Sequence, residues 1–131
     1  MDSPTADGFS AYIPIDDLHV NGELTQGENI ADLGGLKLAY AALQTALRQH
    51  PQPALLDGFT PAQRFFLSWA KVWHTNRRPE SQRLQVNTDP HSPAQFRVNG
   101  PLSNLPEFFE AFKIPEGSPM RRPEAERVVI W

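Results

Sequence analysis

Residues 22–43, GELTQGENIADLGGLKLAYAAL, contain the segment that decides how the chain folds. From Glu28 to about His50, apolar residues recur at steps of three and four, which predicts a helix with one buried stripe. Pro51 directly follows this segment and stops the helix. The stripe consists of Ile30, Leu33, Leu36, Tyr40, Leu43 and Leu47.

A second face of the same helix carries two acids and then small residues: Glu28, Asp32, Gly35 and Ala39. Inside a helix, a glycine costs about 1 kcal/mol relative to alanine. A compensating contact should offset this cost, so we expect another backbone to pack closely against Gly34, Gly35 and Ala39. Both carboxylates would then point into the interface between the two segments. In the alternative interpretation, Glu28 and Asp32 face water and complement the positive end of the helix dipole. The spacing alone leaves both interpretations open.

The rest of the pattern predicts a mainly α fold of short helices joined by proline-rich loops. We expect an irregular N-terminal segment at residues 1–20 and a helical part at residues 21–131. Thr60, Pro61 and Gln63 predict a capped helix that runs to about Thr75.

Three further segments follow that helix. A short helix is expected from Pro79 to near Asn87, and residues 88–101 are expected to form an ordered loop because X-Pro steps at Pro90 and Pro93 disfavour a helix. Asn104 and Glu107 predict the capped start of another short helix, and the tail beyond it is expected to be mostly extended. The clustered phenylalanines and tryptophans are interpreted as core.

Composition excludes several classes of function. The chain has 131 residues, a net charge of -3 and no cysteine, so disulfides and thiolate metal sites are absent. No basic block suggests a nucleic-acid partner, and no apolar run reaches the roughly 18–20 residues of a membrane span. The arginine pairs Arg77–Arg78 and Arg121–Arg122 each adjoin prolines, and solvated turns account for them.

The literal string decides between the two interpretations of the carboxylate face. GENIADLGGLKLAY resembles the G-E-N-x-A-D-x-G-G segment of the neprilysin and endothelin-converting enzyme family of zinc metallopeptidases. FFLSWAKVW, RPE and TDPHSPAQFRVNGPLSNLPEFFEAF resemble later blocks of that family, in order, and the final Trp131 also fits. The resemblance covers roughly residues 10–131 and implies the C-terminal part of a zincin-like catalytic domain.

The resemblance also implies a role for each site residue. Glu28 would be the third protein ligand of a catalytic zinc ion, and Asp32 would be the acid that orients a zinc-binding histidine. His91 would stabilise the oxyanion of the tetrahedral intermediate, and Arg97 would hold a backbone carbonyl of a peptide substrate. Without the resemblance, His91 would be an ordinary surface residue of an X-Pro loop, and Arg97 would extend from an apolar strand.

The family's zinc site also needs a His-Glu-x-x-His sequence, which this chain lacks. We therefore expect a C-terminal portion of a metalloendopeptidase that is inactive alone and binds zinc weakly, since zinc sites use three or four ligands. Its expected partners are peptide substrates and the missing N-terminal part. The bare face at Gly35 and Ala39 leads us to expect self-association. A periplasmic or secreted bacterial parent is favoured over a cytoplasmic one.

The competing hypothesis is a stand-alone helical module that binds a peptide or a partner protein without catalysis. The sequence that precedes Met1 in the native reading frame distinguishes the two hypotheses.

Overall fold

The computed structural model describes residues 8–130. Its helices are α2 (Gly22–Gln49), α3 (Pro61–Val72), α4 (Pro79–Thr88), α5 (Ala94–Leu102), α6 (Pro106–Phe112) and the 3-10 turn η1 (Glu124–Glu126). In the described part of the chain, the only β pairings are two isolated bridges, Ile15 with Leu18 and Leu56 with Phe59. The mainly α fold with irregular connections is confirmed. Trp131 and residues 1–7 lie outside the described residues, so the expectations for them remain predictions.

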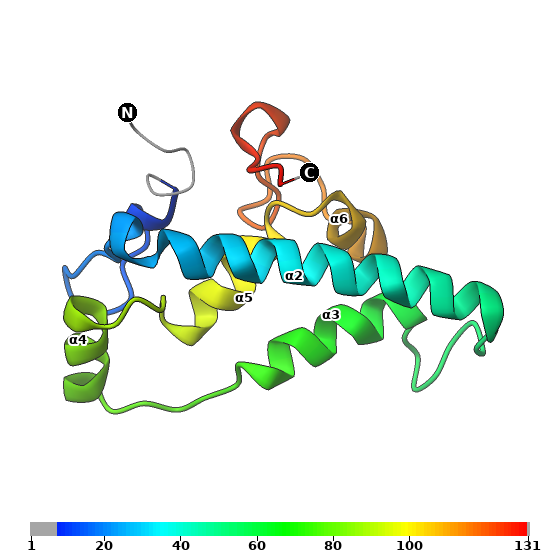
Figure 1. Cartoon of the computed structure of the whole chain (residues 1–131), viewed down its shortest axis with the longest axis horizontal. Coiled ribbons are helices and arrows are strands. Elements are labelled where there is room, and N and C mark those ends of the chain that lie inside the picture. Colours follow the sequence, from blue (N-terminus) through cyan, green and yellow to red (C-terminus); the bar gives the residue numbers. More distant parts are fainter. Residues whose placement is uncertain (1–7, 131) are drawn as a thin grey trace.

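Helix α2 is the long axis of the molecule, as Figure 1 shows. Its 28 residues span about 42 Å at the usual rise per residue. The helix begins at Gly22, six residues before the predicted start at Glu28, because the Asn21 side chain caps it and accepts a hydrogen bond from the Leu24 N–H at 3.0 Å. The predicted end near His50 is confirmed, since the helix ends at Gln49.

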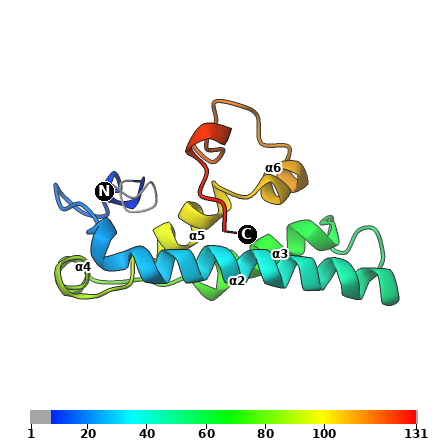
Figure 2. The ribbon, with the colours of Figure 1, turned by 45° about the horizontal axis from the view of Figure 1, so that its top comes forward.

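The main core forms where α2, α3, α5 and α6 meet. Figure 2 shows α5 and α3 lying along α2, with the C-terminal segment folded over them. Phe66 on α3 is 1% exposed and stacks on Tyr40 of α2, and its ring edge also meets Phe108 of α6. The buried members of this core are Leu33, Leu36, Phe66, Leu102, Leu105, Phe108 and Phe109. Most of the aromatic cluster is therefore core, as the sequence suggested.

The start of α3 has the predicted capping box. The Thr60 hydroxyl accepts from the Gln63 N–H at 3.2 Å, and the Gln63 side chain accepts from the Thr60 N–H at 3.0 Å. The Gln63 amide also donates to the Ala111 carbonyl at 2.9 Å, which ties α3 to α6. The helix ends at Val72, three residues before the predicted Thr75.

The predicted loop at residues 88–101 is wrong, because Ala94–Leu102 form helix α5. The X-Pro steps at Pro90 and Pro93 lie before the helix: Pro90 is in the preceding turn, and Pro93 occupies the N-cap position. Pro101 falls in the last turn, where the helix loses one backbone hydrogen bond but is about to end.

The predicted cap at Asn104 is also wrong. Helix α6 begins at Pro106, with Leu105 at the N-cap and no side-chain capping bond. The buried Asn104 side chain instead donates to the Gly100 carbonyl at 2.8 Å and accepts from the Val128 N–H at 2.9 Å. It therefore joins the end of α5 to the C-terminal segment.

The N-terminal segment packs against α5 through a second, smaller core of Phe9, Val20 and Phe96. Tyr12 stacks on Phe96 with ring centroids 4.3 Å apart. A Cβ added at Gly100 would lie 2.5 Å from the Phe9 ring, so the close approach of this ring requires glycine there. Arg83 of α4 forms an ion pair with Asp16. Within the described part of this segment, residues 8–10 are helical and the rest is irregular.

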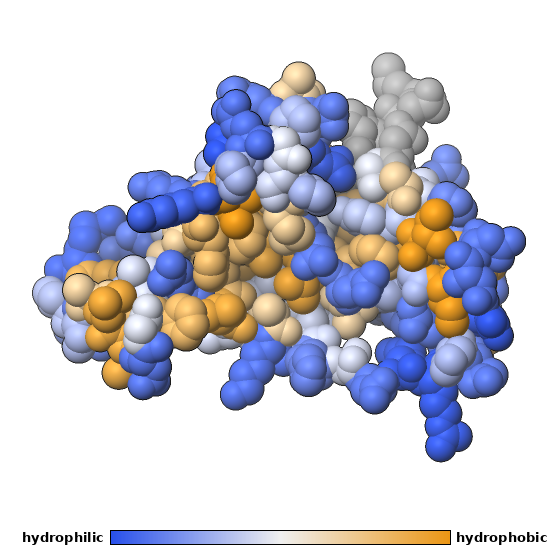
Figure 3. Space-filling view, turned by 180° about the vertical axis from the view of Figure 1, so that it is seen from behind, coloured by the Kyte–Doolittle hydropathy of each residue, from blue (hydrophilic) through white to orange (hydrophobic). Residues whose placement is uncertain are grey.

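The surface keeps some large apolar side chains. From the side opposite to Figure 1, apolar areas alternate with projecting polar side chains (Figure 3). The exposed apolar residues include Leu38, Leu55, Leu56, Phe59, Leu67 and Val72. No helix among residues 8–130 is long and apolar enough to cross a membrane.

Candidate functional site

The two acids of α2 have different surroundings. The Asp32 side chain is 8% exposed, and the Glu28 side chain one turn earlier is 42% exposed. Helical spacing places both on the side of α2 that faces α5 and the loop before it. The interpretation in which both acids face open water is therefore wrong for Asp32, whose charge needs a partner when buried.

Arg97 of α5 is that partner. Its Nε donates to Asp32 Oδ2 at 2.6 Å and its Nη2 donates to Asp32 Oδ1 at 2.7 Å, which is the two-point geometry that guanidinium and carboxylate groups favour. Asp32 bonds to the edge of the guanidinium, and one face of the group covers the Trp73 ring, with Arg97 Cζ 4.0 Å from the ring centre. The suggestion that Arg97 extends from an apolar strand is wrong, because the residue belongs to a helix and its side chain is 12% exposed.

His91 stands between two carboxylates. Its Nδ1 lies 2.6 Å from Asp89 Oδ1, and its Nε2 lies 3.3 Å from Glu28 Oε2. Asp89 Oδ1 also accepts the backbone N–H of His91 at 2.9 Å. These bonds, first the one from the backbone N–H and then the one from the ring, hold the pKa of Asp89 below its usual value. His91 is therefore fixed in orientation rather than free on the surface.

Buried hydrogen bonds attach the loop of His91 to α2. Asn29 is 2% exposed and accepts the Ser92 hydroxyl at 2.9 Å, while its amide donates to the Thr25 hydroxyl at 3.0 Å. Ser92 itself is 1% exposed. Asn29 directly follows Glu28, and Ser92 directly follows His91. Their hydrogen bond therefore fixes the position of the His91 loop relative to α2.

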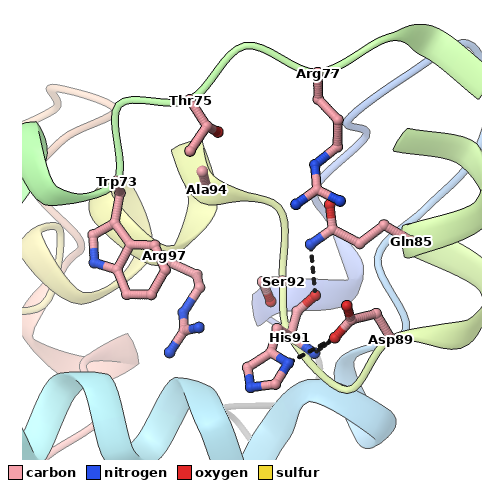
Figure 4. Close-up of a pocket in the computed structure, with 9 residues that line it drawn as sticks. All are labelled: Trp73, Thr75, Arg77, Gln85, Asp89, His91, Ser92, Ala94 and Arg97. Atoms are coloured by element: carbon pink, nitrogen blue, oxygen red, sulfur yellow. Dashed lines mark hydrogen bonds and ion pairs between the residues drawn. The ribbon is translucent and has the colours of Figure 1, made fainter. Parts of the chain in front are cut away.

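The arginine and the histidine line a cavity of about 230 Å³. Figure 4 shows its walls, which come from α5, the loop that carries His91, α4, and the link between α3 and α4. The lining residues are Trp73, Thr75, Arg77, Gln85, Asp89, His91, Ser92, Ala94 and Arg97. Trp73 was expected in the core, but it forms a wall of this cavity, and its buried Nε1 has no hydrogen-bond partner among the described residues.

The four site residues predicted from the sequence thus form one cluster. Glu28, Asp32, His91 and Arg97 are linked by the contacts above, and Arg97 Nη2 also lies 3.6 Å from Glu28 Oε2. Asp89 was not among the predicted site residues. The available signal was its position two residues before His91, because an Asp side chain often accepts a hydrogen bond from the backbone N–H two residues later.

The described residues do not by themselves fit a zinc ion. No group of three histidine, cysteine or acidic side chains in residues 8–130 could hold a metal. Both Asp32 oxygens are bonded to Arg97, and Glu28 is left as a single half-exposed carboxylate beside a histidine and an arginine. One carboxylate is too few for a tight zinc site.

The small residues of α2 differ in exposure. Gly34 is buried, whereas Gly35 and Ala39 are exposed. Apart from the backbone of the helix itself, no described atom lies within 4 Å of the position that a Cβ on Gly35 would take.

The model of Peptidase family M13 matches residues 1–128 of this chain. The chain belongs to that family. This M13 chain is 50% identical over 119 residues to neprilysin-1 of Caenorhabditis elegans, and 53% identical over 116 residues to human endothelin-converting enzyme 1. These matches cover 88% and 86% of the chain but only 16% and 14% of the two relatives.

Solved structures agree with the family assignment. The fold resembles the zinc metalloprotease Zmp1 of Mycobacterium tuberculosis in complex with an inhibitor, with a TM-score of 0.91 and 38% identity over 98% of this chain and 20% of that one. It also resembles PepO of Lactobacillus rhamnosis, with a TM-score of 0.80 and 34% identity over 98% of this chain and 19% of that one. The M13 chain therefore spans about a fifth of these proteins. No finding favours the stand-alone binding module.

Proposed function

We propose that this chain is the portion of a zinc-dependent metalloendopeptidase that supplies one metal ligand and binds the peptide substrate. The observation that carries the proposal is the cluster of Glu28, Asp32, His91 and Arg97 beside a cavity, in a chain of the M13 family. Zinc is named in the Zmp1 relative, and peptide cleavage is the activity that the family name implies.

Arg97 is suited to hold a substrate carbonyl. Asp32 uses Nε and Nη2, and no hydrogen bond among the described residues uses Nη1. Since Trp73 covers one face of the guanidinium, the group is held in one plane, and Nη1 can donate to a peptide oxygen without reorganisation. In this proposal Asp32 positions Arg97. Each Asp32 oxygen also keeps a free lone pair, which can accept a hydrogen bond from a zinc-binding histidine in another part of the full polypeptide.

His91 is suited to meet a developing negative charge. Because Asp89 accepts a hydrogen bond from Nδ1, the proton of the neutral ring belongs on Nδ1, and Nε2 donates only when the ring is doubly protonated. Nε2 is the nitrogen that faces Glu28. When the ring is doubly protonated, Nε2 is a charged donor for an oxyanion that forms near Glu28.

Glu28 is the contribution of this chain to the metal site in this proposal. The 131 residues contain no His-Glu-x-x-His sequence, so the remaining ligands must come from elsewhere in the full polypeptide. The chain alone is then expected to bind zinc weakly and to cleave no peptide.

Zinc content and peptide cleavage test the proposal. The full-length polypeptide that contains this chain should hold one zinc ion and show chelator-sensitive cleavage, whereas its Glu28→Gln variant should lose most of both. Glu23→Gln is the matched control, because Glu23 is an exposed acid in the first turn of the same helix. Wild-type zinc content in Glu28→Gln, or chelator-sensitive cleavage by the 131-residue chain alone, would overturn the proposal.

We also propose that the exposed face at Gly35 and Ala39 receives the rest of the enzyme. In the absence of that part, the same face supports self-association of the chain. Sedimentation of the 131-residue chain over a wide range of concentrations tests this, and a strictly monomeric profile at high concentration contradicts it.

A further inference from the structure

Arg77 projects into the cavity without a partner. It lies on the link between α3 and α4, and Figure 4 shows its side chain extending from that link toward Gln85 and His91. Within residues 8–130, no ion pair or hydrogen bond of its guanidinium is found. Arg77 is exposed on an irregular link, which agrees with a solvated residue, and its side chain also lines the cavity.

Among the charged residues that line the cavity, Arg77 is the one that forms no ion pair within residues 8–130. The charged lining residues are Arg77, Arg97 and Asp89, with His91 as the titratable fourth. Arg97 is neutralised by Asp32, and Asp89 is bonded to His91. Arg77 is near enough to Asp89 to favour its ionised form, but it makes no ion pair with it. A single negative charge brought into the cavity therefore meets an available guanidinium.

We propose that Arg77 recognises a carboxylate of the bound peptide and makes the enzyme prefer peptides that carry one there. This inference rests on the proposed function, because it assumes that a peptide occupies the cavity. A carboxylate has one negative charge and two oxygens, which match one planar guanidinium. A dianionic phosphate would leave negative charge without a partner beside Asp89.

The arrangement of the walls supports a peptide bound across the cavity. Arg97 comes from α5 and Arg77 comes from the link between α3 and α4; Trp73 lies beside Arg97, and Thr75 lies between Trp73 and Arg77 on that link (Figure 4). A peptide whose carbonyl is held by Arg97 can extend past Thr75 toward Arg77. The cavity of about 230 Å³ has room for one or two small residues.

Two sources of the carboxylate are consistent with this chemistry, namely an Asp or Glu side chain and the C-terminus of a short peptide. Three probes separate them: N-acetyl-Leu-Glu-amide, N-acetyl-Leu-Gln-amide and N-acetyl-Leu-Gln with a free carboxylate. The first has a side-chain charge, the second has none, and the third has a terminal charge.

The experiment measures dissociation constants of the three probes for the full-length polypeptide by NMR titration in the presence of a chelator, so that nothing is cleaved. We expect at least one acidic probe to bind about three- to fivefold more tightly than the neutral one, as for a partly exposed ion pair. Arg77→Gln should remove this preference, Arg77→Glu should reverse it, and Arg77→Lys should retain part of it. Arg78→Gln is the matched control, since the neighbouring Arg78 does not line the cavity.

Several results would overturn the inference: equal binding of all three probes, no binding of any, or loss of the preference in Arg78→Gln as well. Arg77 is exposed, and circular dichroism of each variant checks that it folds as the wild type does. Because probe binding is measured without zinc, a failed zinc or cleavage experiment with Glu28 does not decide this result, and the failure of one proposal can be told from the failure of the other.

Discussion

Arg97 holds both carboxylate oxygens of Asp32, and the two residues are 65 positions apart in the sequence. The side chains are 12% and 8% exposed, so the pair is almost removed from water. This bond joins α2 to α5 at the point where the two helices carry the proposed metal ligand and the proposed carbonyl donor.

We predict that Asp32→Ala destabilises the 131-residue chain by about 3–5 kcal/mol, because it leaves a buried guanidinium without its counter-charge. Urea unfolding measures the loss. The double variant Asp32→Leu/Arg97→Met should recover part of it, because no unpaired charge remains. Arg83→Gln, which removes an exposed pair with Asp16, should change the unfolding free energy much less. Equal effects of Asp32→Ala and Arg83→Gln would contradict this account.

Asp89 gives the stability of the chain a dependence on pH. Its pKa is lower in the folded chain than in the unfolded one, so ionised Asp89 stabilises the fold above the unfolded pKa of about 3.9. This contribution is lost as the pH falls through the folded pKa. The difference in unfolding free energy between the wild type and Asp89→Asn should therefore be full near pH 6 and shrink below about pH 4. A difference that stays constant from pH 6 to pH 2.5 would show that the effect does not come from this carboxyl group.

Two helical glycines should respond in opposite directions to alanine. Gly35→Ala should stabilise the 131-residue chain by about 0.5–1 kcal/mol, because the position is open and alanine favours the helix. Gly100→Ala should destabilise it by about 1–3 kcal/mol, because the new Cβ would lie 2.5 Å from Phe9 Cζ. Thermal unfolding of both variants checks the signs. If another element covers Gly35 in the full-length polypeptide, the same Gly35→Ala change should destabilise that protein.

The capping box of α3 offers a simpler measurement. Thr60→Ala should cost about 1 kcal/mol, because the Gln63 N–H loses its acceptor at the helix start. Thr45→Ala is the control, since Thr45 is an exposed residue in the interior of α2 whose hydroxyl bonds only within its own helix. Urea unfolding of the two variants should give clearly different midpoints, and matching midpoints would mean that the cap contributes little.

The sequence predicted the elements whose signals are local. Thr60, Pro61 and Gln63 predicted the start of α3, because a capping box involves only neighbouring residues. Asn104 has the same local signature, but its side chain bonds to Gly100 and Val128, which come together only in the fold. Tertiary contacts therefore override the capping preference at that position.

In the site, too, local sequence signals were predictive and tertiary contacts were not predicted. The literal string around Glu28 and His91 predicted that these residues belong to one site, and the structure brings them within 3.3 Å of each other. The pairing of Asp32 with Arg97 could not be predicted from spacing, because it depends on residues 94–102 forming a helix rather than the expected loop. Trp73 was assigned to the core because its side chain is apolar. Apolarity alone does not distinguish a core residue from a residue that lines a cavity.

Glu28 and Asp32 are built into one uninterrupted 28-residue rod that also carries Leu33 and Leu36 into the aromatic core. Any tilt or slide of that rod displaces the two acids together and preserves their mutual separation. A change in the distance between the acids and the other site residues must therefore come from the opposite side, where His91 and Arg97 are carried by a short loop and a nine-residue helix.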